Sequence, residues 1–170
     1  MGTRVAVSSL LDLLHEMRSM IERIDDESYT APAPGRCTSG IGRHVRHCLD
    51  HIGALVEGTH CGLCAYDRRA RGTAVETCRI AAVRRILDLE TDLLRMTTEP
   101  LDASIAIETQ LDTDGSCLVT TSTVGRELIF VISHTIHHNA LIAHLLAEHS
   151  IDVGARFGYA PATPVAVCAQ

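Results

Sequence analysis

The chain has 170 residues, of which 46 % are hydrophobic and 21 % charged, a balance typical of a soluble globular protein, and we expect one domain over residues 1–170. The formal net charge of −6 and the aromatic content of 3 % argue against a nucleic-acid-binding protein, which needs a basic face or aromatic stacking platforms. No stretch reaches the roughly 18 uninterrupted apolar residues of a membrane helix, and the N-terminus lacks a signal-peptide core. We therefore expect a cytoplasmic protein with no membrane partner.

Four stretches have the apolar spacing of amphipathic helices. They cover about residues 5–25, 39–58, 73–96 and 124–148. Proline and glycine break the chain after the first stretch, and a polar loop follows the second. On the third helix we expect seven apolar side chains to face the core: Ile80, Val83, Ile86, Leu87, Leu89, Leu93 and Leu94.

The connection between the third and fourth helices is long and not helical in pattern. Asp114-Gly115 lies between alternating residues of segment 105–121, which suggests a small hairpin or an extended crossover. Ser122 and Thr123 are candidate N-cap residues for the fourth helix. The pattern predicts an all-α four-helix bundle with a long crossover between helices three and four, in which a small hairpin can lie.

Six of the ten histidines fall in two short clusters on the second and fourth predicted helices: His44, His47 and His51, then His134, His137 and His138. Within each cluster the histidines are three, four or seven residues apart, which places them near one another on a helix surface. The exception is the adjacent pair His137 and His138. His134 and His138 are one turn apart, so that two imidazoles can bind one metal ion. A histidine of the second helix would complete a site with open positions, as in catalytic metal centres.

The segments Ser39-Gly-Ile-Gly-Arg-His-Val-Arg-His-Cys-Leu-Asp-His51 and Ser133-His-Thr-Ile-His-His-Asn-Ala-Leu-Ile142 resemble the DinB-like (YfiT-like) metalloenzyme family, and the resemblance spans most of the chain. It implies a four-helix bundle, often a homodimer, that binds a divalent metal through one histidine of the second helix and an HxxxH pair of the fourth. Carried over, the pair is His134 and His138, and the second-helix ligand aligns best at His47, with His51 and His44 as alternates. Imidazole ligands suit zinc, nickel and iron alike.

A three-histidine metal can lower the pKa of bound water or activate a thiolate. The resemblance implies a metal-dependent hydrolase or a transferase that uses a low-molecular-weight thiol, with a small-molecule substrate. Glu127, two turns before His134, is a candidate general base or acceptor for an imidazole N–H, and the alternative is a helix-starting acid favoured by the macrodipole. Asp67, Arg69 and Arg71 are candidate substrate-binding residues, in which the arginines hold a carboxylate, and the alternative is a surface ion-pair loop.

Two further hypotheses compete with the metalloenzyme that we favour. The first is a non-catalytic metal-binding or stress-response protein that uses its seven cysteines, read as reduced thiols, and above all the motif Cys61-Gly-Leu-Cys64. The second is a structural bundle without a metal. Loss of Cys61 or Cys64 should abolish the response of a sensor, whereas an enzyme should tolerate those losses but not His134→Ala.

Overall fold

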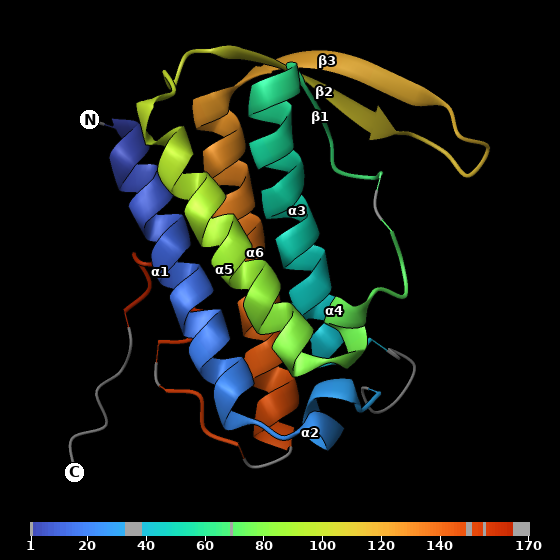
Figure 1. Cartoon of the computed structure of the whole chain (residues 1–170), viewed down its shortest axis with the longest axis vertical. Coiled ribbons are helices and arrows are strands. Elements are labelled where there is room, and N and C mark those ends of the chain that lie inside the picture. Colours follow the sequence, from blue (N-terminus) through green and yellow to red (C-terminus); the bar gives the residue numbers. More distant parts are fainter. Residues whose placement is uncertain (1, 33–38, 69, 149–150, 155, 165–170) are drawn as a thin grey trace.

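The computed structural model describes residues 2–32, 39–68, 70–148, 151–154 and 156–164 (Figure 1). Four long helices lie side by side: α1 (Gly2–Arg23), α3 (Ile41–Cys61), α5 (Arg79–Arg95) and α6 (Val124–Glu148). The shorter elements are α2 (Asp26–Thr30), α4 (Ala74–Thr77), the 3₁₀ turn η1 (Met96–Thr98) and the strands β1 (Leu63–Ala65), β2 (Ser104–Gln110) and β3 (Cys117–Thr123).

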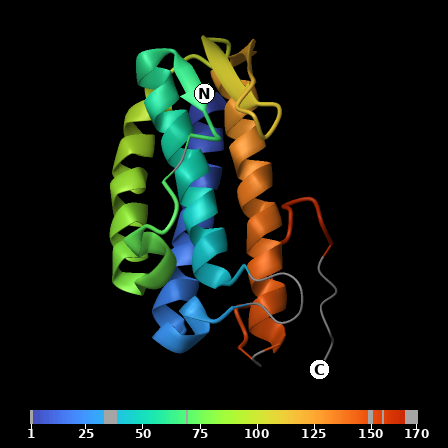
Figure 2. The ribbon, with the colours of Figure 1, turned by 90° about the vertical axis from the view of Figure 1, so that its right-hand side faces the viewer.

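Each long helix contributes an apolar face to one core. Helix α1 packs against α5 and α6, and α3 packs against the same two helices, so that α3 lies between α5 and α6 in Figure 2. The core between the helices is mainly aliphatic, because the chain has no tryptophan and an aromatic content of only 3 %. Fully buried members include Leu10, Leu14, Met17, Ile52, Leu55, Ile86, Leu89, Leu128 and Val131.

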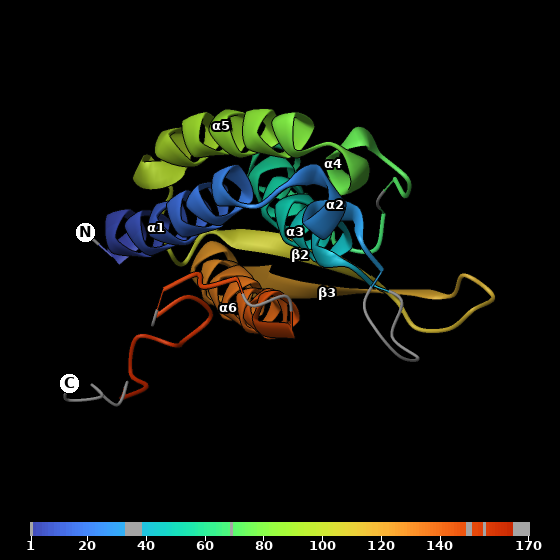
Figure 3. The same ribbon diagram turned by 90° about the horizontal axis from the view of Figure 1, so that it is seen from below.

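The directions of α3 and α5 determine the path of the segment that connects them. Both α3 and α5 begin at the end of the bundle that holds α2 and α4, and both finish at the end that holds the sheet (Figures 1 and 3). The described parts of the segment that follows α3, residues 62–68 and 70–73, therefore lie along the length of the bundle on the way back to α4. That return brings the loop beside the first half of α3, where the histidines are.

The fold is mainly helical, but the expectation of an all-α class was too narrow. The suggested hairpin is confirmed: β2 and β3 pair antiparallel from Ser104↔Thr123 to Gln110↔Cys117. Strand β1 adds to it in parallel, with Leu63 opposite Ala106, which makes a three-stranded mixed sheet. A strand of three residues has no readable alternation, and its partner lies some forty residues later in the chain.

The third predicted helix differs from expectation in two ways. The backbone of Cys78 is extended (φ −135°, ψ 111°), which divides the segment into α4 and α5. The side chains of Ile80, Leu87 and Leu94, expected in the core, are 65 %, 44 % and 58 % exposed. Residues seven apart share one helix face, so these three side chains point in the same direction. They face the solvent because a different stripe of α5 packs into the core, formed by Ala82, Ile86, Leu89 and Leu93.

Helix α6 has the bounds that the sequence predicted, and Thr123 caps it by accepting a hydrogen bond from the Arg126 N–H at 3.2 Å. Among the described residues, its segment Val124–Ala147 alone is long and apolar enough to cross a membrane, with a mean hydropathy of 1.2. This is weak evidence for a membrane segment, because the core helix of a soluble protein passes the same test.

Candidate metal centre

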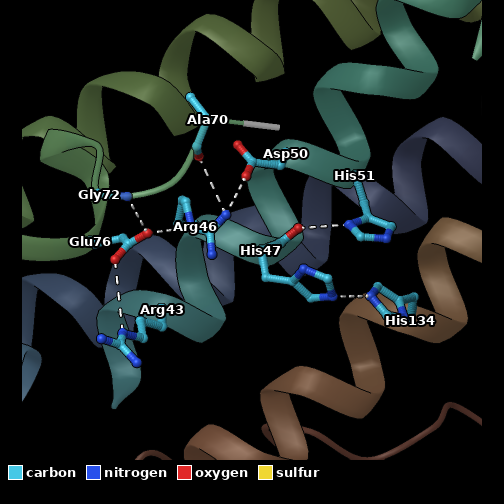
Figure 4. A network of polar contacts seen from close by, with 9 residues as sticks. All are labelled: Arg43, Arg46, His47, Asp50, His51, Ala70, Gly72, Glu76 and His134. Atoms are coloured by element: carbon cyan, nitrogen blue, oxygen red, sulfur yellow. Dashed lines mark hydrogen bonds and ion pairs between the residues drawn. The ribbon is translucent and has the colours of Figure 1, made fainter. Parts of the chain in front are cut away.

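Histidines of α3 and α6 meet where these two helices pack together. The Nε2 atoms of His47 and His134 lie 2.9 Å apart (Figure 4). The ring of His51 lies 4.3 Å, centre to centre, from each of the other two rings. One ligand atom of each of the three residues lies within 4.8 Å of the others, so the cluster could hold a metal ion.

A backbone contact sets the tautomer of the neutral His51 imidazole. Its Nδ1 lies 2.9 Å from the carbonyl oxygen of His47, one helical turn earlier. A carbonyl oxygen can only accept a hydrogen bond, so the proton of the neutral imidazole is on Nδ1 and the lone pair is on Nε2. This arrangement is the usual one for a metal-binding histidine, whose second nitrogen is held by a carbonyl or carboxylate. The donor set therefore fits a divalent metal ion.

His138 and His44 extend the cluster toward the beginning of α3. The ring of His138 lies 4.6 Å from those of both His47 and His134, and its Nδ1 lies 2.9 Å from Nδ1 of His44. Burial, followed by the neighbouring histidines, lowers the pKa of His138 to about 3. Burial is also the main cause that lowers the pKa of His44. Both imidazoles are therefore neutral at neutral pH, the form that a metal requires.

The predicted ligands His47, His134 and His138 are thus neighbours in space, and His51, predicted as an alternate ligand, completes the tightest group of three with His47 and His134. His44 contacts His138. His137, the remaining member of the second cluster, has an exposed side chain.

Two aromatic rings cover the cluster on the side of the sheet. Tyr66 stacks on His51 with ring centres 5.2 Å apart and an angle of 13° between the planes. Phe130 stacks on His134 at 5.6 Å and 22°. These contacts restrict the rotation of both imidazoles.

Glu127 lies beyond these rings, and its side chain is fully buried. Its Oε2 accepts a hydrogen bond from the Tyr66 hydroxyl at 2.7 Å, and its Oε1 accepts from Ser122 Oγ at 2.6 Å and from Arg126 Nη1 at 2.8 Å. The carboxylate therefore has three charge-assisted hydrogen bonds. It connects the first turn of α6 to the ring that stacks on His51, and its assignment as a general base stays a prediction.

A cavity of about 530 Å³ opens beside the histidines. It lies within the range of roughly 300–1,000 Å³ that is usual for small-molecule sites. Its wall consists of Ser39, Arg43, His44, Arg46, His47, Arg71, Gly72, Glu76 and His138. Of the three substrate-binding candidates, Arg71 lines this cavity, Asp67 accepts a hydrogen bond from the Gln110 N–H at 3.0 Å, and Arg69 lies outside the described residues.

Three further residues of the cavity wall were not predicted from the sequence: Arg43, Arg46 and Glu76. For Arg43 a signal was present, because it precedes His47 by one helical turn. Glu76 carried no such signal, since it reaches the cavity from α4, which is distant in the chain.

The cysteine pair lies at the other end of α3. Cys61 is exposed in the last turn of that helix, and Cys64 is buried in β1. Both are free thiols, and burial is the main cause that raises the pKa of Cys64 to about 11. A thiol with a raised pKa is a poor nucleophile and a poor metal ligand.

No family model and no solved structure matches the chain significantly. Among curated proteins, the chain is similar to "FK506-binding protein 5" of Rhizopus delemar, with 32 % identity over 99 residues. The match covers 58 % of this chain and 26 % of that protein, so the chain spans about a quarter of the length of this relative.

Proposed function

We propose that the chain binds a divalent metal ion between α3 and α6 and is a metal-dependent hydrolase or a transferase for a low-molecular-weight thiol, related to the DinB-like metalloenzymes. The observation that carries the proposal is the group His47, His51 and His134, whose ligand atoms lie within 4.8 Å of one another. The donor chemistry suits zinc, nickel or iron. A bound ion of this kind lowers the pKa of a water molecule or a thiol.

The chain's own residues support such chemistry in three ways. His51 is oriented by the His47 carbonyl and the stacked ring of Tyr66. The cavity that His47 and His138 line gives a small molecule access to the cluster. Phe130 and Tyr66 place apolar ring surface against His134 and His51. A site with protein ligands on one side and a cavity next to it is the arrangement of a catalytic rather than a structural metal centre.

In this proposal Arg71 contacts the substrate, and Glu127 has a structural role, since it ties the first turn of α6 to the hydroxyl of Tyr66. As a general base, Glu127 would have to accept a proton on a carboxylate that already accepts three hydrogen bonds and is fully buried. The homodimer belongs to the same proposal and rests on the family resemblance.

The first test is metal content, measured by plasma mass spectrometry on tag-free protein purified without added metal. We expect near-stoichiometric metal in the wild type and its loss in His134→Ala and in His47→Ala. His60→Ala, an exposed histidine of the same helix α3, is the matched control and should keep the metal. A wild-type protein that neither contains metal nor binds it on titration would reject the proposal.

The alternative is a non-catalytic metal-binding protein that uses its cysteines. Among the residues that the structure describes, the group that could hold a metal contains histidines and no cysteine. A Cys61→Ser, Cys64→Ser variant should therefore keep its metal. Loss of the metal from that double variant would favour the sensor or buffer over the enzyme.

A further inference from the structure

The cavity beside the histidines has more positive than negative side chains. Arg43, Arg46 and Arg71 line it, against the single carboxylate of Glu76. The chain as a whole has a formal net charge of −6, so this local excess runs against the overall charge. Positive groups gathered in a cleft raise the local concentration of small anions. Which arginines can bind a ligand depends on the partners that each already has.

Arg46 is already paired. Its Nη1 donates to Asp50 Oδ2 at 3.0 Å, and its Nε lies 2.8 Å from Glu76 Oε1 (Figure 4). The residue is only 8 % exposed, and its single positive charge faces two carboxylates. Arg46 therefore acts as a structural cation that is not free to bind a ligand, and it offsets part of the negative charge of Glu76.

The same network holds the backbone on both sides of Arg71. Arg46 Nη1 also donates to the Ala70 carbonyl at 3.5 Å, and the Gly72 N–H donates to Glu76 Oε1 at 3.0 Å (Figure 4). Gly72 has a φ of +68°, a conformation that glycine adopts without strain. Within the described part of the chain, the Arg71 guanidinium forms no hydrogen bond or ion pair. Its five N–H donors remain available while its backbone is already ordered.

Arg43 is the second available cation. Its Nε lies 3.9 Å from Glu76 Oε2, beyond hydrogen-bond distance, and its side chain is 56 % exposed. It lines the same cavity as Arg71 and precedes His47 by one turn of α3. Arginines on two separate elements, α3 and the returning loop, thus face one cavity whose wall also includes His44, His47 and His138.

We propose that Arg43 and Arg71 form an oxyanion-binding subsite that holds a carboxylate or phosphate group of the substrate beside the histidine cluster. A planar guanidinium forms paired hydrogen bonds with either group. The substrate class is therefore a small anionic molecule whose reacting group lies toward the histidines. The role of the ligand as a substrate rests on the proposed function, whereas binding of the anion does not.

The test measures anion binding by tag-free, metal-free protein at about pH 8, above the ordinary pKa of histidine. Sodium succinate and sodium phosphate are titrated at constant ionic strength, and binding is followed by the backbone amide shifts in NMR spectra. The variants are Arg43→Gln and Arg71→Gln, both at exposed side chains. Arg4→Gln, exposed in the first turns of α1 at the sheet end, is the matched control. Far-UV circular dichroism checks that each variant is folded.

We expect saturable binding of at least one anion, with affinity lower on the order of tenfold in Arg43→Gln and in Arg71→Gln. Arg4→Gln should bind within about twofold of the wild type, because an exposed distant charge is screened. The tighter of the two anions identifies the group as carboxylate or phosphate. No saturable binding, wild-type affinity in both cavity variants, or an equal loss in Arg4→Gln would overturn the subsite.

Metal content of the same proteins separates this inference from the proposed function. The cavity variants should keep the metal that His134→Ala loses. Anion binding in a wild-type protein that binds no metal would support the subsite and reject the proposed function. Metal binding without anion binding would do the reverse.

Discussion

The chain has three tyrosines. Replacing each of them by phenylalanine tests how much the hydrogen bond to the buried Glu127 carboxylate contributes to the free energy of unfolding. The Tyr66 hydroxyl donates to this carboxylate at 2.7 Å. The Tyr29 hydroxyl donates at 2.6 Å to the neutral carbonyl of Val75, and Tyr159 is 51 % exposed. Phenylalanine at each position removes only a hydroxyl, so the three variants compare a charged acceptor, a neutral acceptor and a site open to solvent.

The expected magnitudes follow from the acceptors. A hydrogen bond to a charged group contributes about 1.5–3 kcal/mol, and one between neutral groups about 0.5–1.5 kcal/mol. Glu127 keeps Ser122 and Arg126 as donors in Tyr66→Phe, so we expect a loss at the lower end, about 1.5–2 kcal/mol. Tyr29→Phe should cost about 1 kcal/mol and Tyr159→Phe less than about 0.5 kcal/mol. Burial and, after it, the neighbouring side chains of Cys64 and Glu127 raise the pKa of Tyr66 far above its usual range, so its hydroxyl stays protonated and remains a donor.

The assay is urea unfolding of metal-free protein, followed by far-UV circular dichroism, because a bound metal would add its own binding energy to the folded state. Metal affinity should change little in Tyr66→Phe, since the ring that stacks on His51 is kept. A Tyr66→Phe variant that is no less stable than Tyr29→Phe would refute the reasoning. A large loss of metal affinity in Tyr66→Phe would show that the hydroxyl, and not the stacked ring, positions His51.

Four other perturbations probe the site and its supports. Loss of an outer hydrogen-bond partner of a metal ligand typically costs about 10–100-fold in affinity, so His51→Ala should weaken metal binding by more than that in a chelator competition, and unchanged affinity would favour the set with His138 instead. In metal-free protein the free energy of unfolding should fall as the pH drops from about 6.5 toward 3, because the unfolded chain binds a proton that the lowered pKa of His138 denies to the folded state; His138→Gln should flatten that slope. Arg46→Met should cost about 2–3 kcal/mol in urea unfolding, since it leaves two partly exposed carboxylates without their cation, and a neutral effect would contradict the network. Gly58→Ala would put a Cβ 2.7 Å from Cys64 Cβ, and we expect a loss of about 1–3 kcal/mol from this overpacking.

Local patterns in the sequence were sufficient to predict much of the fold. The four helical stretches and the hairpin around Asp114-Gly115 depend on interactions between residues that are close in the chain, which is why periodicity and turn residues reveal them. The bounds of α6 and the cap at Thr123 follow for the same reason. The two histidine clusters are likewise visible as spacings on single helices.

Only the tertiary structure determines which helix faces and which strands come into contact. The apolar residues of α5 form more than one stripe, and only packing against α1 and α3 selected Leu89 over Leu87 for the core. The pairing of β1 with β2 depends on a contact across the chain that no local pattern encodes.

The same distinction holds for the candidate site. Spacing within α3 and α6 indicates which histidines share a helix face, and so predicted that a member of each cluster would meet the other. The relative rotation and shift of the two helices are set by the whole core, and they determine that His51 joins His47 and His134. The return of the loop along the bundle, which brings Arg71 to the cavity, depends on the direction of α5 and has no counterpart in the local sequence.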